Sequence, residues 1–197
     1  MSLGFDDLIE SHISTLDPEY IDSFRELVDS SVRKKFESID SRYEEHQQRE
    51  YDDPELKYLN GSWIEDDAIY MSDVSALADE LSIIALYKLF EKKHKELIQY
   101  HTGEADSTKY SYWKDALKAL PENAKQLNSF KSANELRLIN NSIKHEGNVS
   151  KELSDEFPSF GSKGDEFSEL NKIFDRLKPG IIKYINELHH EFKCKKT

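Results

Sequence analysis

Apolar residues recur at intervals of three, four and seven along most of the chain, which is the spacing of one face of an α-helix. Such stripes cover about residues 5–16, 18–48, 72–101, 110–120, 132–146 and 165–192. The widest stripe lies in 72–101, which predicts that this segment is the most buried helix. Only seven Gly and five Pro interrupt the chain, few for a β-rich domain with many tight turns. The sequence therefore predicts an all-α fold, a helical bundle of about five to seven helices in a single domain.

Three interruptions divide this pattern. Residues 51–71 lose the helical period and contain a proline, a glycine and an acidic run, which together predict a long loop. Residues 147–164 have a similar character, and Pro179–Gly180 predicts a break or kink in the last helix. The expected single domain, 1–197, comprises acidic N-terminal helices in 1–50, the long loop in 51–71 and a core bundle in 72–197.

Charge is unevenly distributed along the chain. Residues 1–80 hold 22 acidic and 7 basic side chains, a net charge of −15, whereas residues 81–197 hold 17 and 20, a net charge of +3. The overall charge of −12 opposes binding to nucleic acid or anionic lipid. A polyanion is therefore expected to approach only the C-terminal part of the chain.

Hydropathy and cysteine content predict the compartment. No run of 18 apolar residues occurs, so we expect no membrane-spanning helix. The N-terminus lacks the basic start and apolar stretch of a secretory signal. The single cysteine, Cys194, excludes an internal disulfide, and a reducing cytoplasm is the expected location.

The most informative stretch is a predicted helix over about residues 132–146. Ser132 and Glu135 have the spacing of a capping box, and Gly147 is placed to end the helix. At about 100° per residue, one face of this helix is apolar and consists of Leu136, Ile139 and Ile143.

A second face of the same helix is polar. It spans roughly 100° and carries Arg137, Asn141, Lys144 and His145. An imidazole can transfer a proton to or from a ribose or leaving-group oxygen, and an amide can orient it. Arg and Lys can neutralise charge on a phosphoryl group, so this chemistry requires no metal or cofactor. Lys and His in a last helical turn also stabilise the helix dipole without any further function, and this simpler interpretation remains open.

Residues 135 to 147 read Glu-Leu-Arg-Leu-Ile-Asn-Asn-Ser-Ile-Lys-His-Glu-Gly. This segment resembles the signature helix of the HEPN superfamily, whose usual motif is an Arg, a polar residue and a His four to six residues after the Arg. Asn141 and His145 match the polar residue and the His. Asn140 stands where the Arg is expected, and Arg137 precedes His145 by a longer interval, with seven residues between them.

The resemblance implies a helical bundle that commonly dimerises and often acts as a metal-independent endoribonuclease in toxin–antitoxin, abortive-infection or CRISPR-linked defence systems. It implies His145, Arg137 and Asn141 as catalytic residues, and Lys144 and Asn140 as substrate contacts. The expected partners are a second copy of the chain and either RNA or a partner protein. The alternative that the displaced Arg favours is a non-catalytic, dimeric protein-interaction module. The net charge of +2 over residues 131–151 favours RNA.

Overall fold

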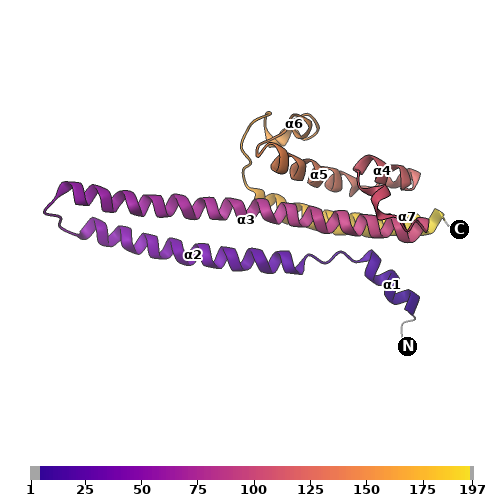
Figure 1. Cartoon of the computed structure of the whole chain (residues 1–197), viewed down its shortest axis with the longest axis horizontal. Coiled ribbons are helices and arrows are strands. Elements are labelled where there is room, and N and C mark those ends of the chain that lie inside the picture. Colours follow the sequence, from indigo (N-terminus) through magenta and orange to yellow (C-terminus); the bar gives the residue numbers. More distant parts are fainter. Residues whose placement is uncertain (1–4, 196–197) are drawn as a thin grey trace. The chain divides into compact units, whose positions relative to one another are not determined.

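A computed structural model describes residues 5–195, and within that range the chain is all-α and contains no strand (Figure 1). The predicted all-α helical bundle is thus confirmed. The α-helices are α1 (Phe5–Ser14), α2 (Glu19–Gln48), α3 (Pro54–Thr102), α4 (Trp113–Ala119), α5 (Phe130–His145), α6 (Lys151–Glu156) and α7 (Leu170–Lys195). Three short 3₁₀ turns lie between them, namely η1 (Ser107–Tyr110), η2 (Glu122–Gln126) and η3 (Pro158–Phe160).

The contacts within this fold group the chain into two compact units. The hairpin comprises residues 19–82, that is, α2 and the first part of α3. The core unit comprises residues 5–18 together with residues 83–195. These limits differ from the predicted division into 1–50, 51–71 and 72–197, because α1 belongs with the C-terminal helices and α3 contributes to both units.

The predicted loop over residues 51–71 is wrong, because α3 already begins at Pro54. The Asp53 carboxylate accepts a hydrogen bond of 2.8 Å from the backbone N–H of Glu55, which satisfies one of the free donors at the helix start. Proline suits the first helical position, since its fixed φ matches the helix and the N–H it lacks would have no partner there. The sequence Asp53–Pro54 therefore starts a helix, although a proline elsewhere often ends one.

The hairpin is antiparallel, and polar contacts set its register (Figure 1). Arg42 Nη1 lies 2.5 Å from Asp67 Oδ2, and His46 Nδ1 lies 2.8 Å from the Tyr51 hydroxyl. At Gly61, an added Cβ would lie 3.2 Å from His46 Nε2. Gly61 therefore lets the two helices approach closely near the hairpin tip.

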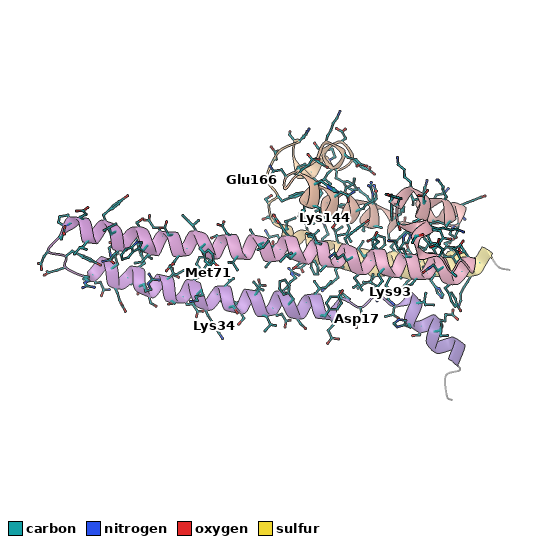
Figure 2. The ribbon with its side chains drawn as sticks, in the orientation of Figure 1. Asp17, Lys34, Met71, Lys93, Lys144 and Glu166 are labelled. Atoms are coloured by element: carbon teal, nitrogen blue, oxygen red, sulfur yellow. The ribbon has the colours of Figure 1, made fainter. Side chains whose placement is uncertain are left out.

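The two helices of the hairpin meet along the inner seam, which we define as the positions of α2 and α3 that face each other. On α2 its buried members are spaced by eleven, seven and seven residues, and they are Ile21, Val32, Ile39 and His46. On α3 its members follow spacings of three and four. Three of them, Ile64, Ala78 and Ser82, are buried, and four are partly buried, namely Gly61, Ala68, Met71 and Ser75. Met71 lies on the side of α3 that faces α2 (Figure 2). The inner seam of α3 is thus built mainly from small residues.

The prediction that residues 72–101 form the most buried helix is wrong for the first ten of these residues. Leu81 is 44% exposed, whereas from Ile83 onward the apolar side chains of α3 enter a core. That core is shared with α5 and α7, and its fully buried members are Ile83, Leu86, Phe90, Leu97, Ile98, Leu136, Leu138, Ile139, Phe174, Leu177, Ile181, Tyr184, Ile185 and Leu188.

The last helix also departs from the sequence-based expectation. It begins at Leu170 rather than near residue 165, directly after Glu169, which has a left-handed backbone conformation with φ of 56°. It then continues through Pro179 without ending. At Gly180 a Cβ would lie 2.8 Å from Ser132 Cβ and would also meet the Ser132 hydroxyl. Glycine is therefore needed here for α7 to pack against α5, and that packing holds α7 together across the proline.

Replacing Gly180 by Ala tests this close packing. In an ordinary helix Gly→Ala stabilises by about 1 kcal/mol, but a clash with Ser132 is expected to reverse the sign and lower the free energy of unfolding by about 1–3 kcal/mol. Urea denaturation measures the change. The double variant with Ser132→Ala should regain part of the loss, and a Gly180→Ala protein that is more stable than wild type would contradict the packing argument.

Candidate functional site

Helix α5 carries the residues that the sequence singled out. Leu136, Ile139 and Ile143 are buried, as the predicted apolar face requires. The helix ends at His145, and Gly147 follows it with φ of 70° and donates its N–H to the Ser142 carbonyl at 3.0 Å. The predicted helix end is therefore confirmed.

The predicted capping box at the start of α5 is wrong. The helix begins two residues earlier, after Ser129, so Ser132 already lies inside it. Glu135 is buried and forms a two-pronged ion pair with Arg176 of α7, with Nη1–Oε2 and Nη2–Oε1 distances of 3.1 and 2.5 Å. The hydrogen bonds to Glu135 raise the pKa of the Arg176 guanidinium. Glu135 thus ties α5 to α7 instead of capping α5.

Lys144, labelled in Figure 2, and His145 occupy the last turn of α5, and both side chains are exposed. Within the described residues 5–195, neither side chain has a hydrogen bond or ion pair to another part of the chain. Both can therefore reach a ligand. Their position also suits the partial negative charge at the helix C-terminus.

Arg137 is engaged in contacts within the protein. Its Nε and Nη2 donate to Asn134 Oδ1 at 3.1 and 3.0 Å, and Nη2 also donates to Glu152 Oε1 of α6 at 3.2 Å. The guanidinium lies over the ring of Trp113, 5.9 Å from its centroid, and the side chain is only 13% exposed. A phosphate would have to displace Glu152 to reach this charge. Arg137 therefore joins α4, α5 and α6 in the manner of a structural residue.

The two asparagines of α5, Asn140 and Asn141, differ in exposure. Asn140 is 1% exposed, and its amide donates to Asn141 Oδ1 over 3.4 Å. The Asn140 Oδ1 is buried without a hydrogen-bond partner among the described residues. Asn140, which the sequence predicted as a substrate contact, is thus buried, whereas Asn141 is half-buried.

The structure does not bring the five predicted residues together in one site. Arg137 and His145 are eight residues apart on one helix, which separates them by about 12 Å along its axis. Arg137 belongs to the network with Asn134 and Glu152, Asn140 and Asn141 form a second pair, and Lys144 and His145 stand alone at the helix end.

Several polar residues of this region were missed at the sequence level. Asn134 Nδ2 donates to Glu156 Oε1 at 2.6 Å, so α6 is fastened to α5 by two of its glutamates. Ser142 and Ser150 are buried and share a hydrogen bond of 2.7 Å. These partners lie 8 and 22 residues apart, and no local pattern in the sequence predicts such pairs.

A cluster of rings lies behind Arg137. His94 of α3 is buried and lies against Phe90, Trp113 and Tyr184, with ring centroids 5.3, 5.4 and 6.0 Å from its own. Burial, and secondly the charge of Lys95, lowers the pKa of His94 from 6.5 to about 3. His94 is therefore a neutral member of the core at physiological pH.

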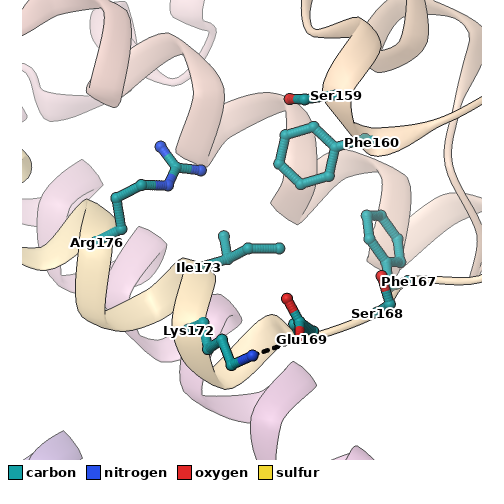
Figure 3. A pocket seen from close by; sticks show the side chains of 8 residues that line it. All are labelled: Ser159, Phe160, Phe167, Ser168, Glu169, Lys172, Ile173 and Arg176. Atoms are coloured by element: carbon teal, nitrogen blue, oxygen red, sulfur yellow. Dashed lines mark hydrogen bonds and ion pairs between the residues drawn. The ribbon is translucent and has the colours of Figure 1, made fainter.

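A cavity of about 280 Å³ lies in the core unit between η3 and the start of α7 (Figure 3). Phe160 and Phe167 form part of its wall with their rings edge to face, 6.4 Å apart. Both of its cations are already paired. Lys172 pairs with Glu169 (Figure 3), and Arg176 pairs with Glu135. The cavity is therefore lined by two aromatic rings together with polar side chains, and its charged residues already have partners.

Comparisons with known proteins add no assignment. A scan against models of known families, and searches of curated proteins and of solved structures, found no match to this chain.

Over residues 5–195, no helix has both the length and the apolar run needed to cross a membrane. In the same range, no three His, Cys, Asp or Glu side chains are grouped closely enough to hold a metal ion.

The buried imidazole makes stability depend on pH. The pKa of His94 is about 3 in the folded protein and 6.5 in the unfolded chain. Between these pH values the unfolded chain therefore binds a proton at His94 that the folded chain does not bind. The resulting stability is present above pH 6.5 and falls as pH drops from there toward 3, by up to about 1.4 kcal/mol per pH unit.

The variant His94→Phe keeps the ring packing and removes this titration. Denaturant unfolding between pH 7 and 4.5 should show a shallower loss of stability for the variant than for wild type. Parallel curves for the two proteins would show that His94 is accessible to protons in the folded state.

Proposed function

We propose that the protein is a non-catalytic helical module that binds a partner protein through its hairpin. The observation that carries the proposal is the distribution of exposed large hydrophobic side chains. Of the 14 in the described residues, 12 lie in the hairpin. They are Tyr20, Phe24, Leu27, Tyr43, Leu56, Tyr58, Leu59, Trp63, Ile69, Tyr70, Leu77 and Leu81. Concentrations of this kind mark surfaces that other proteins cover.

The state of the predicted catalytic set also favours this function over catalysis. Arg137 is paired with Glu152 and Asn140 is buried, so one residue of the predicted catalytic set and one of the two predicted substrate contacts are engaged within the fold. The free, exposed Cys194 fits a reducing cytoplasm, where we place the module. The resemblance to HEPN proteins is compatible with a module of this kind in a defence or toxin–antitoxin system.

Co-purification from source cells tests the proposal. A tagged wild-type chain should recover a defined partner protein, and the variant Leu27→Ser, Tyr58→Ser, Ile69→Ser, Leu77→Ser should lose it. All four side chains are exposed, so the far-UV spectrum should be unchanged. The matched control His145→Ala should keep the partner. Retention of the partner by the fourfold variant and its loss by His145→Ala would overturn the proposal.

A second candidate function, metal-independent RNA cleavage, is favoured by one observation. Lys144 and His145 are adjacent and exposed, and their side chains have no hydrogen bond or ion pair with the other described residues. In this function His145 transfers the proton, Lys144 contacts the phosphate in place of Arg137, and Asn141 orients the reacting groups.

An assay on single-stranded RNA in a metal chelator separates the two functions. The interaction module predicts equal, background cleavage by wild type and His145→Ala. Cleavage by wild type that falls by about 10²–10⁴ in His145→Ala, with a cyclic phosphate product, would instead establish the endoribonuclease. Lys144→Ala serves as the matched change in the same helical turn.

A further inference from the structure

The first part of α3 carries a second, outward-facing series of apolar residues, which we call the outer seam. Its members are spaced by seven residues, and they are Leu56, Trp63, Tyr70 and Leu77. Their exposed fractions are 54%, 59%, 66% and 54%, in that order. A repeat of seven is the pattern by which a helix packs along a partner helix. The inner seam already serves α2, so the outer seam is a separate packing surface.

Helix geometry places the outer seam on one side of α3. Over the 21 residues from Leu56 to Leu77, a seven-residue repeat drifts by only about 60°. The outer seam lies about 100° around the helix from the inner seam, and the exposed Leu59 and Leu81 border it. Its length is about 32 Å, which matches a partner helix of about 22 residues.

A row of carboxylates runs beside the outer seam. Asp66, Asp73 and Glu80 repeat every seven residues and lie about 60° further from α2 than the apolar row. Within the described part of the chain, none of the three has an ion-pair partner. The whole hairpin holds 18 acidic and 7 basic residues, a net charge of −11.

The negative charge of the hairpin decides which kind of helix can bind to the outer seam. A second copy of the hairpin would bring an equal negative charge against the same acidic row, and like charges across a packed seam disfavour pairing. A cationic helix gains from the same row, because Lys and Arg beside its apolar stripe would meet Asp66, Asp73 and Glu80.

We propose that the outer seam of α3 binds a cationic amphipathic α-helix of a partner protein. The inference rests on the proposed function and names its partner class. Leucine-sized residues of the partner pack between Leu56, Trp63, Tyr70 and Leu77, and its basic residues line the acidic row. Affinity then depends on both apolar contact and charge, so it falls as salt concentration rises.

Three labelled peptides of about 22 residues test the proposal with the full chain, by fluorescence anisotropy. The first has Leu at alternating intervals of three and four, with Lys at the flanking positions. The second replaces each Lys by Glu, and the third scrambles the first. The first should bind saturably and weaken in salt, and the other two should bind at least about tenfold more weakly. Equal binding by the scrambled peptide would overturn the proposal.

Matched variants locate the binding surface. Trp63→Ser with Leu77→Ser should weaken the first peptide at least about tenfold, whereas Tyr58→Ser with Ile69→Ser should change its affinity less than about twofold. The control pair is also exposed, at 75% and 61%, but lies about 115° away around α3. Asp66→Asn with Asp73→Asn should weaken binding and reduce its salt dependence. Equal losses for the two serine pairs would contradict the assignment.

Two further outcomes separate this inference from the proposed function. If wild type sediments as a dimer that Trp63→Ser with Leu77→Ser dissociates, the outer seam binds a second copy and the inference is wrong. If no peptide binds but the fourfold hairpin variant still loses its partner in cells, the interaction function stands and the cationic-helix assignment fails.

Discussion

The constraint on which the structure depends is how much apolar surface two helices can cover for each other. Two paired helices bury one face of each, so large side chains elsewhere on them stay in water unless another element arrives. From Ile83 onward α3 packs in a core with α5 and α7, and its apolar residues are buried. Before Ser82 it packs only within the hairpin, where α3 contributes mainly small residues to the inner seam while Trp63, Tyr70 and Leu77 remain exposed.

Two charged side chains of α5 form ion pairs with the helices that pack beside it. Glu135 pairs with Arg176 of α7, and Arg137 with Glu152 of α6, so the charged residues of this helix hold its neighbours in place. One partner of each pair is buried, since the side chains of Glu135 and Arg137 are only 6% and 13% exposed, and removing its counter-charge would leave that buried charge unpaired. The segment that resembles a catalytic motif thus holds the helices of the core unit together. In its last turn, Lys144 and His145 are exposed and can contact another molecule.

Sequence patterns predicted the helical class, the position of α5 and its end at Gly147, because local spacing and a single left-handed residue decide these features. The sequence patterns did not predict the helix over residues 54–71. Helical periodicity was sought among large apolar residues, whereas the positions that face α2 are occupied by small residues such as Gly61 and Ala68. A search for a seven-residue repeat would have found this helix. The patterns also did not predict that α7 continues through Pro179 or that Glu135 pairs with α7. Both features depend on residues far apart in the sequence, namely Gly180 against Ser132 and Glu135 with Arg176.

The chain has two tryptophans, and they report on the two surfaces in question. Trp63 is in the outer seam, and Trp113 lies under Arg137 beside α5. The most direct measurement is the pair of indole N–H signals in the NMR spectrum of the full chain during titration with the Lys-flanked helical peptide. The account predicts that the Trp63 signal shifts saturably while the Trp113 signal stays in place. A shift of Trp113 with Trp63 unchanged would contradict it.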